Sequence, residues 1–281
     1  ESTPSCGCQH QVLLTVAEET NQNLTAAQKE LLLWHWRLGH LGFESLQRLM
    51  VPPTKRATPS GITTGPWLTT KIASTRTCAP PKCAACELSK AKCRHTGSTT
   101  TQHNPARQGS LSYNHLRPGQ QVSVDQYESS VRGRLSTSKG KESFGQRYGG
   151  GTIFCDHASG YIAAHHQLSL RATDTINSKR KFERSLRSCG VSVDEYHGDN
   201  GVFKARAFQD ELLLREQRMH FSGVGAKHQN GKAERSIHTV TEMARSMMQH
   251  AYLHWPEEFN QDLWPFALDH DFWLHNHTPH P

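Results

Sequence analysis

The chain has 281 residues, of which 35% are hydrophobic and 20% are charged, and its formal net charge is +7. This apolar content is enough for one or two domains with cores, which excludes a disordered or fibrous chain. The longest apolar run, LLLW at 31–34, is far below the ~18 residues that a membrane-spanning helix needs. Because the chain has no initiating Met and no signal segment, we expect it to be part of a longer precursor.

The positive charge is unevenly distributed. Residues 24–109 hold 12 Lys and Arg against 3 Asp and Glu, whereas residues 110–281 hold 20 against 19. A second basic concentration lies at 132–147, and its basic members are Arg132, Arg134, Lys139, Lys141 and Arg147. Such patches suit a polyanionic partner, because Lys and Arg replace the counterions on phosphates. A merely solvated basic surface is the alternative.

The first third of the chain predicts a short helical domain. Residues 1–23 show no sustained period and are expected to be a linker. Thr25 and Gln28 have the spacing of a capping box, so an apolar helix should follow them and end at Gly39. A second short helix is expected at 43–50. Six prolines between 51 and 82 leave no room for long regular elements. A Ser/Thr/Gln-rich linker at 101–112 should separate this domain, 24–100, from a second domain at 113–281.

The second domain alternates strands and helices. The expected elements are a strand at 121–127, a hairpin at 150–169, a helix at 172–190, a strand at 191–196, a helix at 205–216, a strand at 218–222 and a long helix at 230–251. Ile176, Phe182, Leu186 and Cys189 form the apolar stripe of the first of these helices. A hairpin followed by alternating strands and helices predicts an α/β fold with a mixed sheet flanked by helices.

Four side chains in the first domain have the spacing of a metal site. His35 and His40 are separated by four residues, and Cys83 and Cys86 by two. Two imidazole and two thiolate ligands suit a closed tetrahedral Zn²⁺ site, and C-x-x-C favours metal or redox chemistry in a reducing compartment over disulfides. Cys78 and Cys93 are alternative ligands. The other interpretation is that these are core or surface histidines and incidental cysteines, with no metal site. Zinc binding would contribute the folding free energy that this proline-rich domain needs.

Three carboxylates in the second domain stand at special places. Asp125 shares one face of its strand with Ser123 and Tyr127, while Val122 and Val124 share the other. Asp199 lies in YHGDNG, directly after a predicted strand, where α/β sheets place reacting groups. Asp-Asn-Gly is also a common turn signature, so a plain turn is the alternative. Glu234 lies on the flank of the long helix, beside the stripe that should pack on the sheet: Ala233, Ile237, Val240, Ala244 and Met247.

If these carboxylates converge, their mutual repulsion requires cations between them. Oxygen-only ligands select Mg²⁺ or Mn²⁺, and two such ions ~4 Å apart clamp the attacking and leaving oxygens of a phosphoryl displacement. The competing acid, Asp156, lies at the tip of the predicted hairpin and is expected to form the turn.

The motifs VSVDQY, YHGDNG and HQNGKAERS, in this order, resemble the D,D-35-E catalytic core of retroelement integrases, which has the ribonuclease-H fold. The segment 126–198 separates Asp125 from Asp199, and the segment 200–233, one position shorter than usual, separates Asp199 from Glu234. The residues that fit the mobile loop ahead of the glutamate are Phe221, Ser222, Gln229, Asn230 and Gly231. LLLWHWRLGHLGFESLQRL and CAACELSKAKCRH resemble the pre-integrase segment of copia-type LTR retrotransposons, although the gap between His40 and Cys83, 41–82, is longer than usual.

This resemblance implies an integrase fragment of a retrotransposon Gag-Pol-type polyprotein, which processes DNA 3′ ends and joins them to target DNA. It implies two Mg²⁺ or Mn²⁺ ions held by Asp125, Asp199 and Glu234, and one structural Zn²⁺. DNA contacts are expected from Lys227, His228, Lys232, Arg235, Arg132, Arg134, Lys139 and Lys141. It also implies a homo-oligomer found in the nucleus and in cytoplasmic virus-like particles. A cut-and-paste DNA transposase with the same core, or a non-catalytic domesticated DNA-binding protein, is the alternative.

Overall fold

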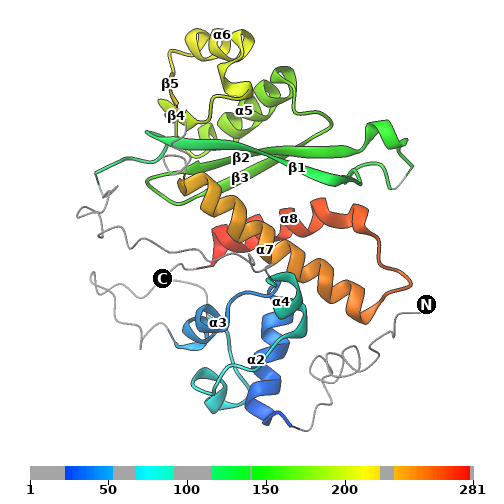
Figure 1. Cartoon of the computed structure of the whole chain (residues 1–281). Helices are drawn as coiled ribbons and strands as arrows, with labels where there is room; N and C mark the ends of the chain where they lie inside the picture. Colours follow the sequence, from blue (N-terminus) through cyan, green and yellow to red (C-terminus); the bar gives the residue numbers. More distant parts are fainter. Residues whose placement is uncertain (1–22, 53–66, 92–114, 140, 222–230, 279–281) are drawn as a thin grey trace, which may run out of the picture. The chain divides into compact units, whose positions relative to one another are not determined.

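The computed structural model describes residues 23–52, 67–91, 115–139, 141–221 and 231–278 (Figure 1). Contacts divide the chain into two compact units. The helical unit consists of 1–90, 131–147 and 238–281, and the sheet unit of 91–130 and 148–237. The division is therefore discontinuous along the chain and falls inside one strand and one helix. The linkers predicted at 1–23 and 101–112 lie outside the described residues, apart from Asn23.

The sheet unit contains a five-stranded sheet with the strand order β3-β2-β1-β4-β5. Its elements are β1 (Val122–Gly133), β2 (Tyr148–Asp156), β3 (Ile162–Gln167), α5 (Ala172–Arg187), β4 (Glu195–Gly198), η4 (Val202–Lys204), α6 (Arg206–Leu214), β5 (Arg218–Phe221) and the start of α7 (Gly231–His254). Strands β2 and β3 pair antiparallel, whereas β4 pairs parallel to both β1 and β5. The predicted fold class, a ribonuclease-H-like mixed sheet flanked by helices, is confirmed.

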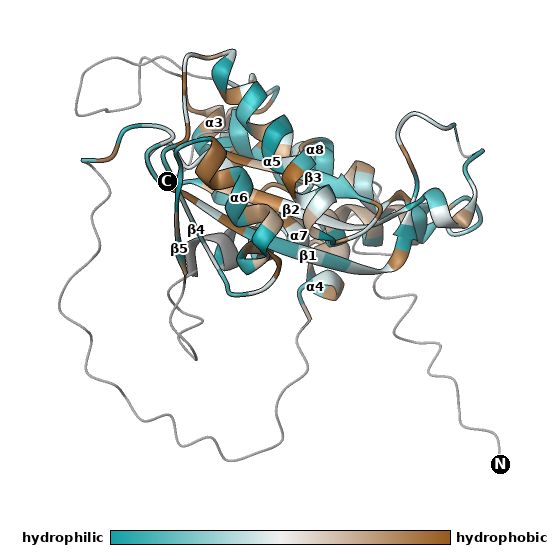
Figure 2. Cartoon of the chain, turned by 90° about the horizontal axis from the view of Figure 1, so that it is seen from above, coloured by the Kyte–Doolittle hydropathy of each residue, from teal (hydrophilic) through white to brown (hydrophobic). Residues whose placement is uncertain are grey.

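The core of this unit lies on one face of the sheet, between the strands and the helices α5 and α6. Its fully buried members include Val122, Val124, Phe154, Phe182 and Tyr196. Phe154 and Phe182 stack with ring centroids 4.5 Å apart, which joins β2 to α5. The elements mix hydrophilic and hydrophobic residues, as amphipathic helices and half-buried strands do (Figure 2). The presence of both Val122 and Val124 in this core agrees with the predicted alternation of β1.

Two details of this unit differ from the expectation. The strand predicted at 191–196 is instead β4, which begins at Glu195. Val193 is buried in the segment before it, where Asp194 N donates to Gly119 O and Asp194 O accepts from Arg218 N. The alternating pattern therefore reflects a buried loop that leads into the strand. Cys189 lies beyond the end of α5 and is exposed, so it does not belong to the apolar stripe.

The helical unit is built from short helices and the rest of α7. Its further elements are α2 (Ala26–Arg37), α3 (Phe43–Met50), η2 (Ala73–Arg76), α4 (Ala84–Ser89), η3 (Phe144–Gln146), η6 (Gln261–Leu263) and α8 (Trp264–His277). The capping box of Thr25 and Gln28 is present. Leu31, Leu46 and Met50 join α2 to α3 in a buried cluster. Within the described part of the chain, no helix combines the length and apolarity that crossing a membrane requires.

Asp271 is a buried carboxylate in α8 of the helical unit. Its relative exposure is 0%, and neither carboxylate oxygen has a hydrogen-bond partner. Burial raises the pKa of this carboxyl from its ordinary value of 3.8 to about 8. Between these two values, the folded protein holds a proton that the unfolded chain has released. Stability is therefore highest at the acid end of this window and falls as the pH rises through it.

We expect Asp271→Asn to remove this pH dependence, because the amide carries no charge at any pH. In the parent protein, the free energy of unfolding should fall by about 1.4 kcal/mol per pH unit between about pH 5 and about pH 7. Denaturant unfolding of the parent and the variant across this range measures the difference, so that other titrating groups cancel. Asp269→Asn, at an exposed position of the same helix, should keep the parental slope. Equal slopes in the parent and Asp271→Asn would contradict the prediction.

Candidate metal centres

The four predicted zinc ligands converge in the helical unit. The ligand atoms of His35, His40, Cys83 and Cys86 all lie within 4.8 Å of one another. Cys86 Sγ lies 3.3 Å from His35 Nε2 and 3.5 Å from His40 Nδ1, and Cys83 Sγ lies 3.5 Å from His40 Nδ1. Ligand bonds of about 2.0–2.3 Å in a tetrahedron separate ligand atoms by roughly 3.3–3.8 Å. The two nitrogen and two sulfur atoms therefore fit one Zn²⁺.

A chain reversal after α2 brings the two histidines together. Five residues of continuous helix would place His40 well round the helix from His35. Instead, Gly39 and His40 both have positive φ, 59° and 65°, and His40 N donates to His35 O at 2.8 Å. A Cβ on Gly39 would come 2.6 Å from Leu274 Cδ1. Both the conformation and the space at this position therefore favour glycine.

Side chains from α2 and α3 hold the segment that leads to the cysteines. The carboxylate of Glu30 accepts hydrogen bonds from the backbone of Lys71 and Ile72, and from Thr75 Oγ1 at 2.8 Å. Gln47 donates to the carbonyl oxygens of Thr75 and Cys78. The long gap between His40 and Cys83 is thus compatible with one site. The alternative ligand Cys78 instead lies near Thr75 O, and Cys93 lies outside the described residues.

Three of the four side chains in the cluster have protonation states that suit metal binding. His35 Nδ1 lies 2.8 Å from Leu41 O, a contact that assigns the proton to Nδ1 and leaves Nε2 as the ligand atom. Burial lowers the pKa of His40, so its imidazole is neutral at physiological pH. A hydrogen bond from Cys86 lowers the pKa of Cys83, which favours its thiolate. Neutral imidazole and thiolate are the ligand forms that zinc requires. The hydrogen bond to Cys83 raises the pKa of Cys86, so this thiol has to lose its proton when a metal binds.

One histidine beside this cluster was not predicted. The ring of His250, from α7, lies 5.0 Å from the ring of His40 and 5.2 Å from that of Trp36. Burial lowers its pKa to about 4, so the ring is neutral. Its place depends on the packing of a distant helix, and no local spacing in the sequence signals it.

The sheet unit brings two of the three predicted carboxylates to neighbouring places. Val122 pairs with Tyr196 and Ser123 with His197 in the parallel β1–β4 ladder. The same register, continued by two residues, sets Asp125 beside Asp199. A Cβ on Gly198 would come 3.1 Å from Val124 Cγ1, so the alignment persists to the end of β4. Since adjacent strands lie about 4.8 Å apart, Asp125, near the start of the long strand β1, lies beside Asp199, which directly follows β4.

Asp125 lies on the face of the sheet opposite the core. Val122 and Tyr196 point into the core, so Asp125, three residues beyond Val122, belongs to the other face. His157 N donates to Gln121 O, and continuing this antiparallel register sets Cys155 beside Ser123 on that same face. The hydroxyl of Ser236 in α7 donates to Cys155 Sγ at 3.4 Å.

The start of α7 therefore covers the face that carries Asp125. Glu234 precedes Ser236 by two residues in the same helix, although its side chain lies outside the described residues. The assignment of Asp125, Asp199 and Glu234 as one metal site accordingly stays a prediction.

Asp199 also has the turn contact that its sequence suggested. Its Oδ1 accepts a hydrogen bond from Gly201 N at 3.0 Å, and the side chain is exposed. A carboxylate has a second oxygen, so this contact is compatible with a metal ligand. Asp156 is a buried turn former, as predicted, because it accepts from Gly119 N, Ser159 N and Ser159 Oγ.

The predicted DNA contacts fall in several environments. Arg134 makes an ion pair with Asp262 at 3.4 Å, and Arg147 pairs with the same carboxylate at 3.1 Å. Lys139 and Lys141 are exposed, as is Arg235 in α7, whereas Arg132 is partly buried. Lys227, His228 and the side chain of Lys232 lie outside the described residues, as do Ser222, Gln229 and Asn230 of the predicted loop. Arg134 and Arg147 thus have a structural partner, which leaves Lys139 and Lys141 accessible.

No protein-family model matches the sequence, and no curated protein matches it. The solved structures that are similar to the chain include the following three. The catalytic core domain of HTLV-2 integrase with magnesium, in a dimeric form, gives a TM-score of 0.37 at 16% identity and covers 56% of this chain and 86% of its own. The trimeric form gives 0.37 at 15% identity, over 56% and 85%. The simian T-cell lymphotropic virus intasome in complex with PP2A regulatory subunit B56 gamma gives 0.40 at 15% identity, over 62% and 61%.

Proposed function

We propose that this chain is the integrase fragment of a copia-type retrotransposon polyprotein, which processes the 3′ ends of the element's DNA and joins them to target DNA. The observation that supports the proposal is the β1–β4 register: continued by two residues, it brings Asp125, near the start of β1, beside Asp199, which follows β4. The start of α7, with Glu234, covers the same face of the sheet, as Ser236 shows by its contact with Cys155. Two carboxylates, with a third that Glu234 would supply, are a ligand set for Mg²⁺ or Mn²⁺.

The proposed chemistry is one phosphodiester displacement carried out twice. When bound, two divalent ions supply activation of the attacking oxygen and stabilisation of the leaving oxygen. In this assignment Asp125 would hold both ions, Asp199 would complete one site and Glu234 the other. The neighbouring Ser123 hydroxyl lies 2.7 Å from His157 Nε2, and Asp125 Oδ1 accepts a hydrogen bond from Gln126 N at 2.8 Å.

The His35, His40, Cys83 and Cys86 cluster supports the retroelement assignment over a cut-and-paste transposase with the same core. In this proposal a structural zinc ion holds the first domain, and the protein acts as a homo-oligomer on element ends and target DNA. It would occur in cytoplasmic virus-like particles and in the nucleus, as part of a longer polyprotein. A non-catalytic domesticated DNA-binding protein is the competing reading, and activity distinguishes the two.

A strand-transfer assay tests the proposed function directly. The full chain, loaded with zinc, is incubated with Mn²⁺ and the element's own terminal DNA, with a supercoiled plasmid as target. Joined products that require both the divalent ion and a free 3′-hydroxyl support an integrase. DNA binding without joining, in protein that is folded and contains zinc, would favour the non-catalytic protein instead.

We expect Lys139→Gln combined with Lys141→Gln to weaken DNA binding and its dependence on salt. Each lysine that contacts a phosphate releases about one counterion, so the slope of log affinity against log salt should become shallower by about 2. Binding is measured by fluorescence anisotropy at several salt concentrations. Lys181→Gln, an exposed lysine of α5 outside the predicted contacts, is the matched control and should leave the slope unchanged. A double variant with the parental slope would contradict the assignment.

A further inference from the structure

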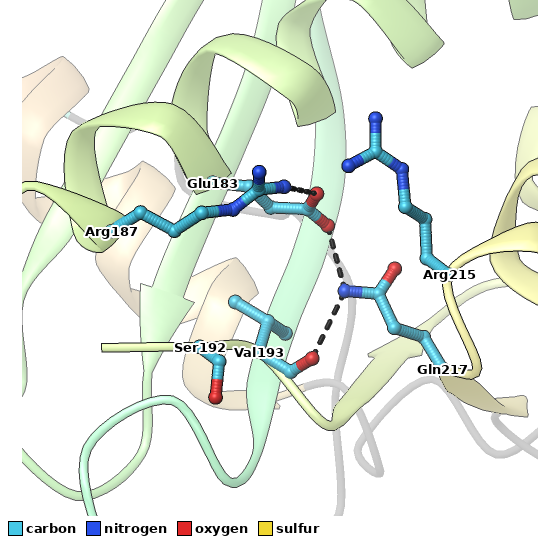
Figure 3. A pocket seen from close by; sticks show the side chains of 6 residues that line it. All are labelled: Glu183, Arg187, Ser192, Val193, Arg215 and Gln217. Carbon is cyan, nitrogen blue, oxygen red and sulfur yellow. Dashed lines mark hydrogen bonds and ion pairs between the residues drawn. The ribbon is translucent and has the colours of Figure 1, made fainter. Parts of the chain in front are cut away.

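A small pocket in the sheet unit lies away from the candidate catalytic carboxylates. It has a volume of about 190 Å³ and is lined by Glu183, Arg187, Ser192, Val193, Arg215 and Gln217 (Figure 3). These residues come from the end of α5, the segment before β4, and the segment between α6 and β5. The pocket therefore lies where β4 and β5 begin, whereas Asp199 lies where β4 ends. Inferences about this pocket do not depend on the proposed integrase activity.

The pocket carries an excess of positive charge. Beneath it, the carboxylate of Glu183 contacts Lys179 at 2.7 Å and Arg187 at 3.5 Å. The carboxylate of Glu211 contacts Arg180 at 2.5 Å and Arg215 at 3.3 Å. Two carboxylates thus form ion pairs with four basic side chains. Arg187 and Arg215, which make the longer contact in each group, are the two that line the pocket, and each guanidinium has five N–H donors.

Gln217 presents an acceptor to the same pocket. Its amide nitrogen donates to Glu183 Oε1 at 2.8 Å and to Val193 O at 2.9 Å. Both partners are acceptors, so they fix which end of the amide is nitrogen. The other end, Oε1, is buried and has no hydrogen-bond partner. Figure 3 shows this oxygen on the Arg215 side of the amide. A ligand that satisfies the site must accept from arginine and donate to Gln217.

We propose that this pocket binds a phosphate group that carries or adjoins a hydroxyl, as in hydrogen phosphate or a ribose phosphate. The two arginines match the oxygens of a phosphate in geometry and charge. The hydroxyl supplies the donor that Gln217 Oε1 lacks, and Ser192 adds a second polar group at the exposed rim. At about 190 Å³, the pocket is smaller than the roughly 300–1,000 Å³ of sites for larger ligands, which suits a single phosphate group.

Comparing hydrogen phosphate with sulfate tests the proposal. At about pH 8 both ions are tetrahedral dianions, but only hydrogen phosphate has an O–H donor. Each is titrated into the zinc-loaded full chain without Mg²⁺ or Mn²⁺, at constant ionic strength set with chloride. Calorimetry and the NMR signal of the Gln217 side-chain amide report binding. Hydrogen phosphate should bind at least about fivefold more tightly than sulfate, because only its O–H can donate a hydrogen bond to Gln217 Oε1. Equal affinities would overturn the proposal.

Substitutions separate this pocket from general surface charge. Arg187→Gln and Arg215→Gln should each weaken hydrogen phosphate binding at least about tenfold, since each removes a charge-assisted hydrogen bond. Arg206→Gln, whose side chain is 94% exposed in a surface pair, is the matched control and should bind as the parent does. If Arg215→Gln does not fold, Arg187→Gln decides, because its side chain is 58% exposed. Equal binding by Arg187→Gln and Arg206→Gln would overturn the site.

Further arms identify the source of the phosphate. Adenosine 3′-monophosphate and its 2′-deoxy counterpart differ only in a hydroxyl beside the phosphate. Tighter binding of the ribonucleotide than of hydrogen phosphate, lost in Arg187→Gln, assigns the site to ribonucleotides. Tighter binding of hydrogen phosphate assigns it to the free ion.

Discussion

Asp125→Asn, Asp199→Asn and Glu234→Gln should each reduce strand transfer to below a few per cent of the parental rate. Each change keeps the size of the side chain and removes the charge that a divalent ion requires. Because the three carboxylates act as one unit, double variants should be no less active than single ones. The assay uses the element's terminal DNA and Mn²⁺, with equal amounts of folded protein in each reaction.

Asp199→Asn distinguishes a metal ligand from a turn residue. Asn can accept the hydrogen bond that Gly201 N donates to Asp199 Oδ1, so the turn and the stability of the fold should survive. If the turn were the whole role of Asp199, this variant would remain active. Asp210→Asn, an exposed carboxylate in α6, is the control and should retain parental activity. An Asp199→Asn protein that joined DNA ends above a few per cent of the parental rate would refute the metal assignment.

The second large effect is expected from the zinc site. Cys83→Ser and Cys86→Ser should each remove the bound zinc and unfold the segment that contains α2, α3 and α4. Structural zinc contributes roughly 10 kcal/mol or more to the folding of small domains, which is more than the short helices of this segment can replace. Metal analysis of the purified full chain measures zinc content, and thermal unfolding followed by circular dichroism measures the loss of helix.

Cys78→Ser is the matched control for the zinc prediction. Its thiol lies near Thr75 O rather than in the cluster, so the variant should keep one zinc ion and a folded helical unit. Unchanged zinc content in Cys83→Ser, or equal loss in Cys78→Ser, would show that the ligand set is wrong.

Much of the fold follows from local signals. The capping box at Thr25, the hairpin around Asp156 and the alternation of Val122 and Val124 each depend on residues close in sequence, and each is present in the structure. The predicted start of β4, residue 191, was too early, since the strand begins at Glu195. Val193 is buried by tertiary packing of a loop, and an alternating pattern cannot distinguish such a loop from a strand. Pairing between strands decides such boundaries, and pairing is not visible locally.

In the candidate sites, too, local signals could be predicted and contacts made by tertiary packing could not. Ligand type and spacing pointed to His35, His40, Cys83 and Cys86, because zinc chemistry restricts both. The packing of His250 against His40 could not be predicted, since α7 reaches this place through the tertiary fold. The nearness of Asp125 to Asp199 depends on a parallel register between β1 and β4, which are far apart in the sequence. Only the order of the motifs along the chain suggested that these two strands would be neighbours.

The cluster of two histidines and two cysteines also determines how the intervening chain can vary. A metal bound there would tie His40 to Cys83 across the whole segment 41–82, much as a covalent cross-link would. Closing a longer chain costs little more entropy, since each doubling of its length adds only about 0.6 kcal/mol. That increment is small beside the roughly 10 kcal/mol of metal binding. Insertions between the two ligand pairs are therefore nearly neutral for stability, provided that Glu30 and Gln47 keep their contacts with the stretch before the cysteines.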